Sequence, residues 1–274
     1  MKSLFSALLF ISVLSGCVVT DGKSEDWSRF ARPSEFQLAT PTIAAAPASR
    51  ILSEPTSLQL ILDRVGTALH YTWDGSTPTQ DSPRYVAPLE RRIGGELKVV
   101  AFGAGFRPSA VARAQFVSPG HVLSDVHIEP DPSAPYVGSG TKTLLDGVAG
   151  SADFRDRRWL GFQSAVTVTI DLGEKVKVTR VLVGTREDPS SWIFFPKSLA
   201  VEVSATGDHY EPWATLEEPP EATPLHFLTV RGDECAARWL RIKISPPEQL
   251  PEHHPGYPDG KPWLFLDEII VEGL

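Results

Sequence analysis

The sequence is poor in cysteine, methionine and basic residues, and these shortages exclude several classes of protein. Its 274 residues include only two cysteines and one methionine, so no framework of several disulfides holds the chain together. Acidic residues outnumber basic ones, 34 to 26, which gives a formal net charge of -8. That balance offers no positive footprint for a phosphate backbone and argues against nucleic acid as a partner.

Long apolar runs are also scarce, and the one at the N-terminus is too short to span a bilayer. Lys2 precedes the apolar residues 4–14, and small residues then lead to Cys17 in the string LSGC. This order is typical of a secretory signal. The string LSGC resembles a bacterial lipobox, which implies that residues 1–16 are removed and that Cys17 is lipidated as the new N-terminus. The alternative is an ordinary secretory signal with an incidental cysteine.

The surroundings of Cys17 also bear on location. Val18, rather than an aspartate, follows the cysteine, and under the Gram-negative sorting rule this favours the outer membrane or cell surface of the bacterial envelope. Several acyl chains anchor a protein stably, whereas a single chain binds reversibly. We expect the membrane to be contacted through this anchor only. Cys235, the remaining thiol, is interpreted as a buried and inert side chain.

Short runs of alternating apolar and polar residues recur after residue 48 and predict strands. Residues 17–48 lack this pattern and are rich in Ala, Pro, Ser and Thr, as in a tether. The runs that follow are separated by Gly, Pro, Asp and Ser. The string SPG at 118–120 predicts a boundary between two units. The runs are LQLIL, ALHYTW, ELKVVAF and AVARAQFV in residues 49–118, and VTVTIDLG, KVTRVLVGT, SLAVEVSATG, ARWLRIKIS and FLDEIIVEGL in residues 121–274.

The first unit carries a motif that makes its expected fold more specific. The run YTWDGSTPT at 71–79, followed by ELKVVAFGAGFRPS, resembles the small β-sandwich near the C-terminus of chitobiases and β-hexosaminidases. The resemblance implies an immunoglobulin- or fibronectin-like sandwich over residues 49–118. Asp74 and Gly75 supply a tight turn, and nothing in the motif requires chemistry.

The second unit, residues 121–274, resembles the discoidin or coagulation-factor V/VIII C-type domain, a galactose-binding-like jelly roll that includes the family 32 carbohydrate-binding modules. The strings RRWLGF, SWIFFP and WLFLDEIIVE carry this resemblance, and they have near counterparts in the version appended to bacterial family 20 glycoside hydrolases. The resemblance implies an all-β chain whose second unit binds ligands through loops at one end.

A lectin-like site needs an aromatic ring for the C–H face of a sugar and planar donors for its hydroxyls. Trp192 lies in the loop EDPSSWIFFP, where apolar side chains are unusually dense. Arg186 would form a bidentate bond to adjacent hydroxyls or pair with Asp188 or Asp156. The tryptophans would instead staple the loops if they pack together. The expected sugar-binding residues are Trp192, Arg186, His254 and Trp159, with Trp263 in second place.

The same resemblance implies a structural calcium ion. Its side-chain ligands would be Asp146 in the string LLDG and Glu268 in the last strand, with backbone carbonyls of residues 150–153 completing the shell. Such hard oxygen ligands suit Ca²⁺. The alternative is that Asp146 and Gly147 form a turn and that Glu268 is a solvated strand residue.

No HExxH, GxSxG, Walker or dinucleotide motif occurs in the chain. The signal, tether and two units also leave no residues in it for the barrel of about 250 residues that carries the acidic pair of family 20 enzymes. The sequence therefore predicts a non-catalytic, lipid-anchored envelope protein that binds N-acetylhexosamine- or galactose-type glycans, with envelope-associated glycoside hydrolases as further candidate partners. A structural or protein-docking lipoprotein is the second hypothesis. An unrecognised glycoside hydrolase, which would need two facing carboxyls, is the third.

The lipidation site can be tested by metabolic labelling. We expect a palmitate analogue to label the wild-type protein and not Cys17→Ala, because the Cys17 thiol is the expected acylation site. Cys235→Ala is the matched control and should keep the label. Equal labelling of wild type and Cys17→Ala would contradict the prediction.

Overall fold

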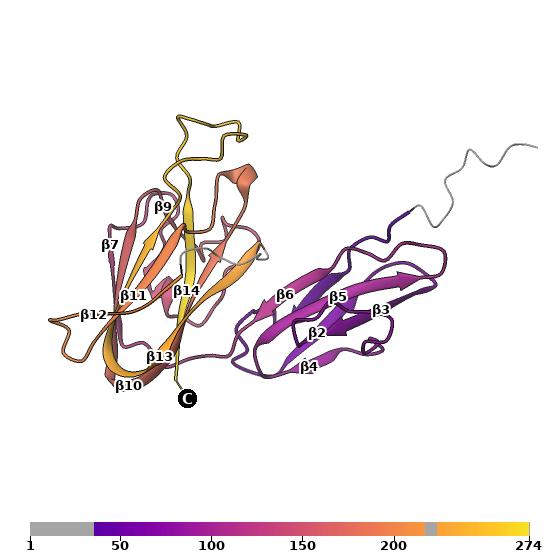
Figure 1. Ribbon diagram of the computed structural model, residues 1–274, viewed down its shortest axis with the longest axis horizontal. Coiled ribbons are helices and arrows are strands. Elements are labelled where there is room, and N and C mark those ends of the chain that lie inside the picture. The colour runs from indigo at the N-terminus through magenta and orange to yellow at the C-terminus, as the bar shows by residue number, and fades with distance from the viewer. Residues whose placement is uncertain (1–35, 217–223, 274) are drawn as a thin grey trace, which may run out of the picture.

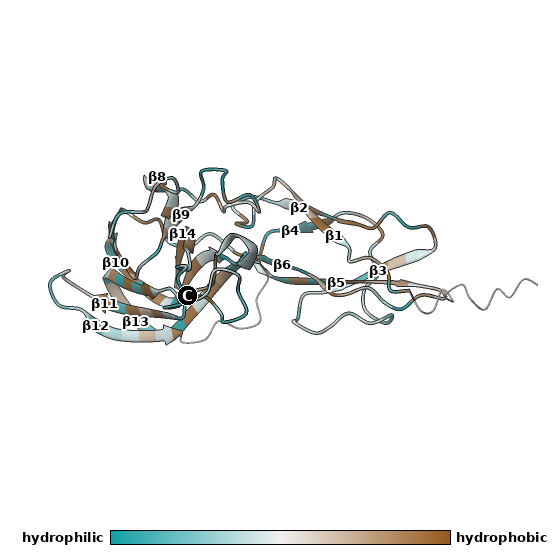
Figure 2. Cartoon of the chain, turned by 90° about the horizontal axis from the view of Figure 1, so that it is seen from above, coloured by the Kyte–Doolittle hydropathy of each residue, from teal (hydrophilic) through white to brown (hydrophobic). Residues whose placement is uncertain are grey.

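The computed structural model describes residues 36–216 and 224–273, which form two β units lying end to end (Figures 1 and 2). Helical structure among them is limited to two short 3₁₀ turns, η3 (Lys142–Leu144) and η4 (Pro189–Ser191). The expected all-β fold is confirmed. Within these two ranges no helix has the length and apolarity needed to cross a membrane. Cys17 lies outside the described residues.

The first unit is a sandwich of two small antiparallel sheets. One sheet contains β1 (Thr42–Ala46), β2 (Thr56–Ile61) and β4 (Leu89–Arg91), in that order; the other contains β3 (Thr67–Thr72), β5 (Gly95–Gly103) and β6 (Ala112–Phe116). Every second residue of β2 is buried, as the alternating sequence predicts. Leu58, Leu60, Leu97 and Val99 form the centre of the core between the sheets.

The turn that follows β3 is built as its sequence predicts. The Asp74 carboxylate accepts hydrogen bonds from the backbone N–H of Ser76 at 3.0 Å and from the Ser76 hydroxyl at 2.6 Å. Gly75 between them has a φ of +83°, a conformation that side chains disfavour. Asp74 therefore shapes the turn, as its position in the sequence predicts.

The second unit is organised around two strands that bend. They are β10 (Val166–Arg186) and β13 (Leu225–Ser245), which pair antiparallel on both sides of a break between Asp171 and Val176 (Figure 1). The first half of β10 also pairs with β7 and the second half with β14. The remaining strands are β7 (Asp125–Glu129), β8 (Gly138–Thr141), β9 (Leu160–Phe162), β11 (Ser198–Ser204), β12 (Glu211–Leu216) and β14 (Leu264–Glu272).

This bend places the two halves of β10 and β13 in different layers, β12-β11-β13-β10-β7 on one side and β13-β10-β14-β9 on the other. One apolar core lies between the layers and includes Val168, Val183, Leu240 and Leu266, each fully buried. The result is a jelly-roll-like sandwich. The long segments 130–159, 187–197 and 246–263 meet at one end of it, called the loop end below (Figure 1).

The first unit packs on the outer face of the β10-β13-β14 layer. Ile51 and Val117 contact an apolar patch of the second unit that contains Leu182, Phe227 and Ile270. The Gln115 side chain adds two hydrogen bonds to the backbone of Phe227, since its amide N–H donates to the carbonyl at 3.1 Å and its oxygen accepts from the N–H at 2.6 Å. Both apolar packing and directed bonds therefore fix the junction.

A buried ion pair crosses the same junction. Arg50 Nη2 lies 3.0 Å from Oδ2 of Asp267, a residue of β14 with no solvent exposure. The same oxygen accepts a hydrogen bond from the backbone N–H of Gly150 at 2.7 Å. Burial raises the pKa of Asp267 to about 6, while the Arg50 guanidinium opposes that shift. The pairing with Arg50 thus favours the ionised carboxylate against the cost of burial.

Removing one partner of this pair should destabilise the protein strongly. Asp267→Ala leaves the Arg50 guanidinium buried without its anion, and we expect a loss of roughly 3–5 kcal/mol in the free energy of unfolding. Glu248→Ala breaks the exposed Lys197–Glu248 pair, whose side chains are 64% and 83% exposed, and should cost about 1 kcal/mol or less. Urea unfolding followed by circular dichroism compares the two. Similar losses would contradict the prediction.

Candidate functional site

Aromatic side chains gather at the loop end in two layers. Trp159 and Phe265 are buried, and Tyr136, Phe154 and Trp263 lie over Phe265, half-buried. The centroids of these three rings are 4.8, 5.7 and 6.1 Å from that of Phe265, at tilted or edge-on angles that suit aromatic pairs. Tyr136, Phe154 and Trp263 thus pack on the buried Phe265 ring, while part of each side chain remains exposed.

Trp192 extends this surface. It is 38% exposed and has a φ of +65°, a left-handed conformation that is uncommon for a bulky residue. Its carbonyl accepts the backbone N–H of Trp263 at 2.8 Å, and the Trp263 carbonyl accepts the N–H of Phe194 at 3.0 Å. These two bonds hold the segment after η4 beside the start of β14. The structure therefore brings Trp192 and Trp263 together.

The ring of Trp192 rests on the Pro-rich loop before β14. A Cβ atom on Gly256 or Gly260 would come within 2.8 or 2.7 Å of the indole, so glycine is required at both positions. His254 meets Trp192 edge-on, with ring centroids 5.6 Å apart. Its Nε2 donates to the carbonyl of Pro189 at 2.9 Å and its Nδ1 accepts the N–H of Gly256 at 3.1 Å. With both nitrogens engaged, His254 positions the loop and does not offer a free donor to a ligand.

Two of the predicted sugar-binding residues are buried, and the prediction is corrected for them. Trp159 is 1% exposed, and its indole N–H donates to the carbonyl of Ser151 at 3.2 Å. Arg186 is 5% exposed; it donates to the carbonyl of Ala152 at 2.7 Å and pairs with Asp188 at 3.3 Å. Neither side chain can contact a ligand from these positions. Both instead fasten segment 151–153 to the sandwich.

The sequence analysis missed part of the exposed surface. Tyr136 and Phe154 belong to its outer layer, and Tyr257 is 39% exposed in the loop next to Trp192. The Arg155 guanidinium lies 4.5 Å from the ring centroid of Phe154 and remains exposed. In the sequence, these residues could have been found only as single aromatic residues inside Pro- or Asp-rich loops. We call Trp192, Trp263, Tyr136, Phe154 and Tyr257 the aromatic surface.

The expected calcium ligands lie near one another. Glu268 is 3% exposed, and its Oε2 accepts the N–H groups of Gly147 at 2.8 Å and Val148 at 3.2 Å. Burial, helped by the charges of Asp146 and Asp267, raises the pKa of Glu268 to about 8. A cation would relieve this cost, and carboxylate oxygens suit Ca²⁺.

Two of the backbone carbonyls that were expected to complete the calcium shell do not point toward Asp146 and Glu268 as free ligands. The carbonyls of Ser151 and Ala152 accept hydrogen bonds from Trp159 and Arg186 and so are directed elsewhere. Across residues 36–216 and 224–273, no three His, Cys, Asp or Glu side chains cluster as metal ligands would. Asp146 and Glu268 are therefore the side chains of the expected shell that the structure leaves as candidates, and further ligands would have to come from other backbone oxygens or water.

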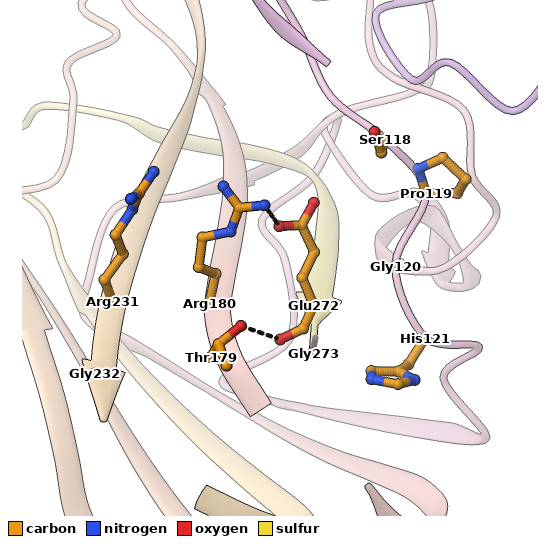
Figure 3. A pocket seen from close by; sticks show the side chains of 10 residues that line it. All are labelled: Ser118, Pro119, Gly120, His121, Thr179, Arg180, Arg231, Gly232, Glu272 and Gly273. Atoms are coloured by element: carbon orange, nitrogen blue, oxygen red, sulfur yellow. Dashed lines mark hydrogen bonds and ion pairs between the residues drawn. The ribbon is translucent and has the colours of Figure 1, made fainter. Parts of the chain in front are cut away.

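The cavities of the described residues bear on the hydrolase hypothesis. The one in Figure 3 measures about 750 Å³ and lies beside the linker between the units, at the end opposite the aromatic surface. Its one carboxylate, that of Glu272, forms an ion pair with Arg180, while Arg231 stands on the neighbouring strand. Another cavity, lined by Lys197, Glu248 and Lys261, also holds one carboxylate. Neither cavity presents the two facing carboxyls that glycoside hydrolysis requires.

Comparisons with known proteins find one matching family model and several solved structures of low similarity. The family model described as "Fn3 associated" matches residues 58–116. A comparison with curated proteins finds no match. The similar solved structures include three with sequence identities of 11–13% to this chain. A pectin-binding carbohydrate-binding module is 13% identical, with a TM-score of 0.38 over 54% of this chain and 89% of the module.

The other two solved structures are of bacterial proteins whose source organisms are known. CpGH89CBM32-6 from Clostridium perfringens is 11% identical, with a TM-score of 0.35 over 55% of this chain and 95% of that one. Chitosan-binding module 1 from a chitosanase/glucanase of Paenibacillus sp. IK-5 is 13% identical, with a TM-score of 0.36 over 57% of this chain and 98% of the module. All three are remote from this chain.

Proposed function

We propose that the second unit binds carbohydrate through the aromatic surface at its loop end. The observation that carries the proposal is the layering of the rings, in which buried Phe265 and Trp159 support partly exposed Tyr136, Phe154 and Trp263. A sugar has an apolar C–H face that packs on such rings and hydroxyls that need planar donors at the rim. Arg155, exposed beside Phe154, provides such donors.

The binding surface is held rigidly, which favours a weakly interacting ligand such as a sugar. Trp192 is tied to Trp263 through the backbone and to His254 through its ring, so little side-chain entropy remains to be lost on binding. The ligand class implied by the family 32 resemblance is N-acetylhexosamine- or galactose-type glycan. Anchored through Cys17, the protein would hold such glycans at the bacterial envelope without catalysis, close to envelope-associated hydrolases.

Loss of the Trp192 ring should weaken glycan binding. Trp192→Ala removes an exposed ring of the aromatic surface beside Trp263, and we expect affinity for N-acetylhexosamine or galactose oligomers to fall roughly tenfold, about 1.4 kcal/mol. Isothermal titration measures this. Trp213→Phe is the matched control, because Trp213 lies on β12 and donates its N–H to Asp233 away from the loop end. Equal affinity of Trp192→Ala and wild type, or no glycan bound by wild type, would contradict the proposal.

We also propose that a calcium ion binds between Asp146 and Glu268. It would favour the ionised form of Glu268, balance the charge of Asp146, and fasten the loop after η3 to β14. Support comes from the buried position of Glu268 and from the Val148 backbone N–H, which donates both to Asp146 at 2.8 Å and to Glu268 at 3.2 Å. The loop continues to Phe154, so the ion would stabilise the aromatic surface indirectly.

Calcium should raise the melting temperature of the protein, because a ligand that binds only the folded state stabilises it. At a free calcium concentration of a hundred times Kd, the free energy of unfolding would rise by about 2.7 kcal/mol. Thermal unfolding in EDTA is compared with unfolding in excess CaCl₂. Glu268→Gln should abolish the difference, while Glu272→Gln on the same strand should preserve it. Equal melting temperatures of wild type in the two buffers would contradict the proposal.

A further inference from the structure

A third cavity, of about 580 Å³, lies between the two units and is separate from the aromatic surface. Its size is within the range of ligand pockets. Strands β1 and β6 line it from the first unit; segment 149–152 and the start of β13 line it from the second. The lining is mostly small and aliphatic, and includes Ile43, Ala44, Ala45, Ala48, Ala114, Ala149 and Ala152. We call this cavity the inter-unit cleft.

Two strand edges border the inter-unit cleft. β1 is the end strand of the sheet β1-β2-β4, and β6 is the end strand of the sheet β3-β5-β6. Among the residues that the structure describes, β1 and β6 have no partner strand on their outer sides, and the nearest backbone pairing is a single parallel bridge between Ile51 and Val117, directly after β6. An open edge presents N–H and C=O groups that can pair with an added strand. The cleft thus combines a backbone template with apolar space beside it.

The inter-unit cleft is also positively charged, against the sign of the whole chain. Arg113 on β6 and Arg158 after the 149–152 segment line it, and both are exposed. Neither has an ion-pair partner within the described part of the chain. Arg50 lines it too; its Nη2 binds Asp267, but its Nε and Nη1 are buried without a hydrogen-bond partner. The Arg50 guanidinium, which also lies 4.7 Å from the ring centroid of Phe227, thus adds positive charge beside the cleft.

We propose that the inter-unit cleft binds an extended acidic peptide segment of a partner protein, which adds a strand to the open edge of β6. Alternate residues of an added strand point to opposite sides. Carboxylates on one side would reach Arg113 and Arg158, and small apolar side chains on the other would cover the alanine lining. A saccharide is less suited, because the aromatic residue of the lining, Phe116, is 3% exposed and offers no ring for stacking.

The test uses the full-length protein in detergent and a fluorescein-labelled hexapeptide that alternates glutamate and valine. We expect binding by fluorescence anisotropy, weakened by salt and reduced at least tenfold in the double variant Arg113→Gln, Arg158→Gln. The pair Arg84→Gln, Arg92→Gln is the matched control, since it removes the same charge from elsewhere on the first unit, and it should retain affinity. The same peptide methylated at alternate backbone nitrogens should not bind, because it cannot pair as a strand.

Three results would overturn the proposal. They are absence of peptide binding to wild type, equal binding by the methylated peptide, and competition by an oligogalacturonate that exceeds that of the unlabelled peptide. Trp192→Ala separates this site from the proposed glycan site. That variant should keep peptide affinity while losing glycan affinity, so each proposal can fail without the other.

Discussion

The carboxylate of Asp267 joins three parts of the molecule that are far apart in the sequence. It lies on the last strand, forms an ion pair with Arg50 of the first unit and accepts the backbone N–H of Gly150 from the loop between η3 and β9. Its other oxygen lies so close to Gly184 that a Cβ atom there would be 1.9 Å away. Because the group is fully buried, its partners cannot be replaced by water, and the arrangement of units, loop and strand depends on it.

The loop that Asp267 holds also connects the two candidate binding regions. Residues 149–152 form one wall of the inter-unit cleft, and Phe154, two residues further on, belongs to the aromatic surface. The loop is fastened at successive positions, by Glu268 at Gly147, by Trp159 at Ser151 and by Arg186 at Ala152. This series of part-buried hydrogen bonds holds the loop in place at several points, although its composition, rich in Gly, Ala, Ser and Asp, resembles that of a flexible segment.

Alternation of apolar and polar residues was sufficient to predict the all-β fold, and the Asp74 turn followed from local chemistry alone. Burial of Trp159 and Arg186 was not predictable in this way, because it depends on contacts with residues distant in sequence. Arg186 reaches Ala152 across 34 positions, and Trp159 packs on Phe265. A tryptophan or arginine in a loop looks the same in sequence whether it faces a ligand or staples the loop. Tyr136 and Phe154 escaped notice for the converse reason, since each is a single aromatic residue without a pattern around it.

The two candidate binding regions differ in the chemistry they offer, which bears on why one chain would carry both. The aromatic surface provides rings, supported by a buried aromatic layer, and suits a ligand with a C–H face. The inter-unit cleft provides guanidinium groups, aliphatic side chains and strand edges, and suits a polypeptide with carboxylates. A net charge of -8 would repel such a polypeptide from most of the surface. The cleft therefore gains selectivity from its contrast with its surroundings, and the junction that creates it is more than a spacer between two sandwiches.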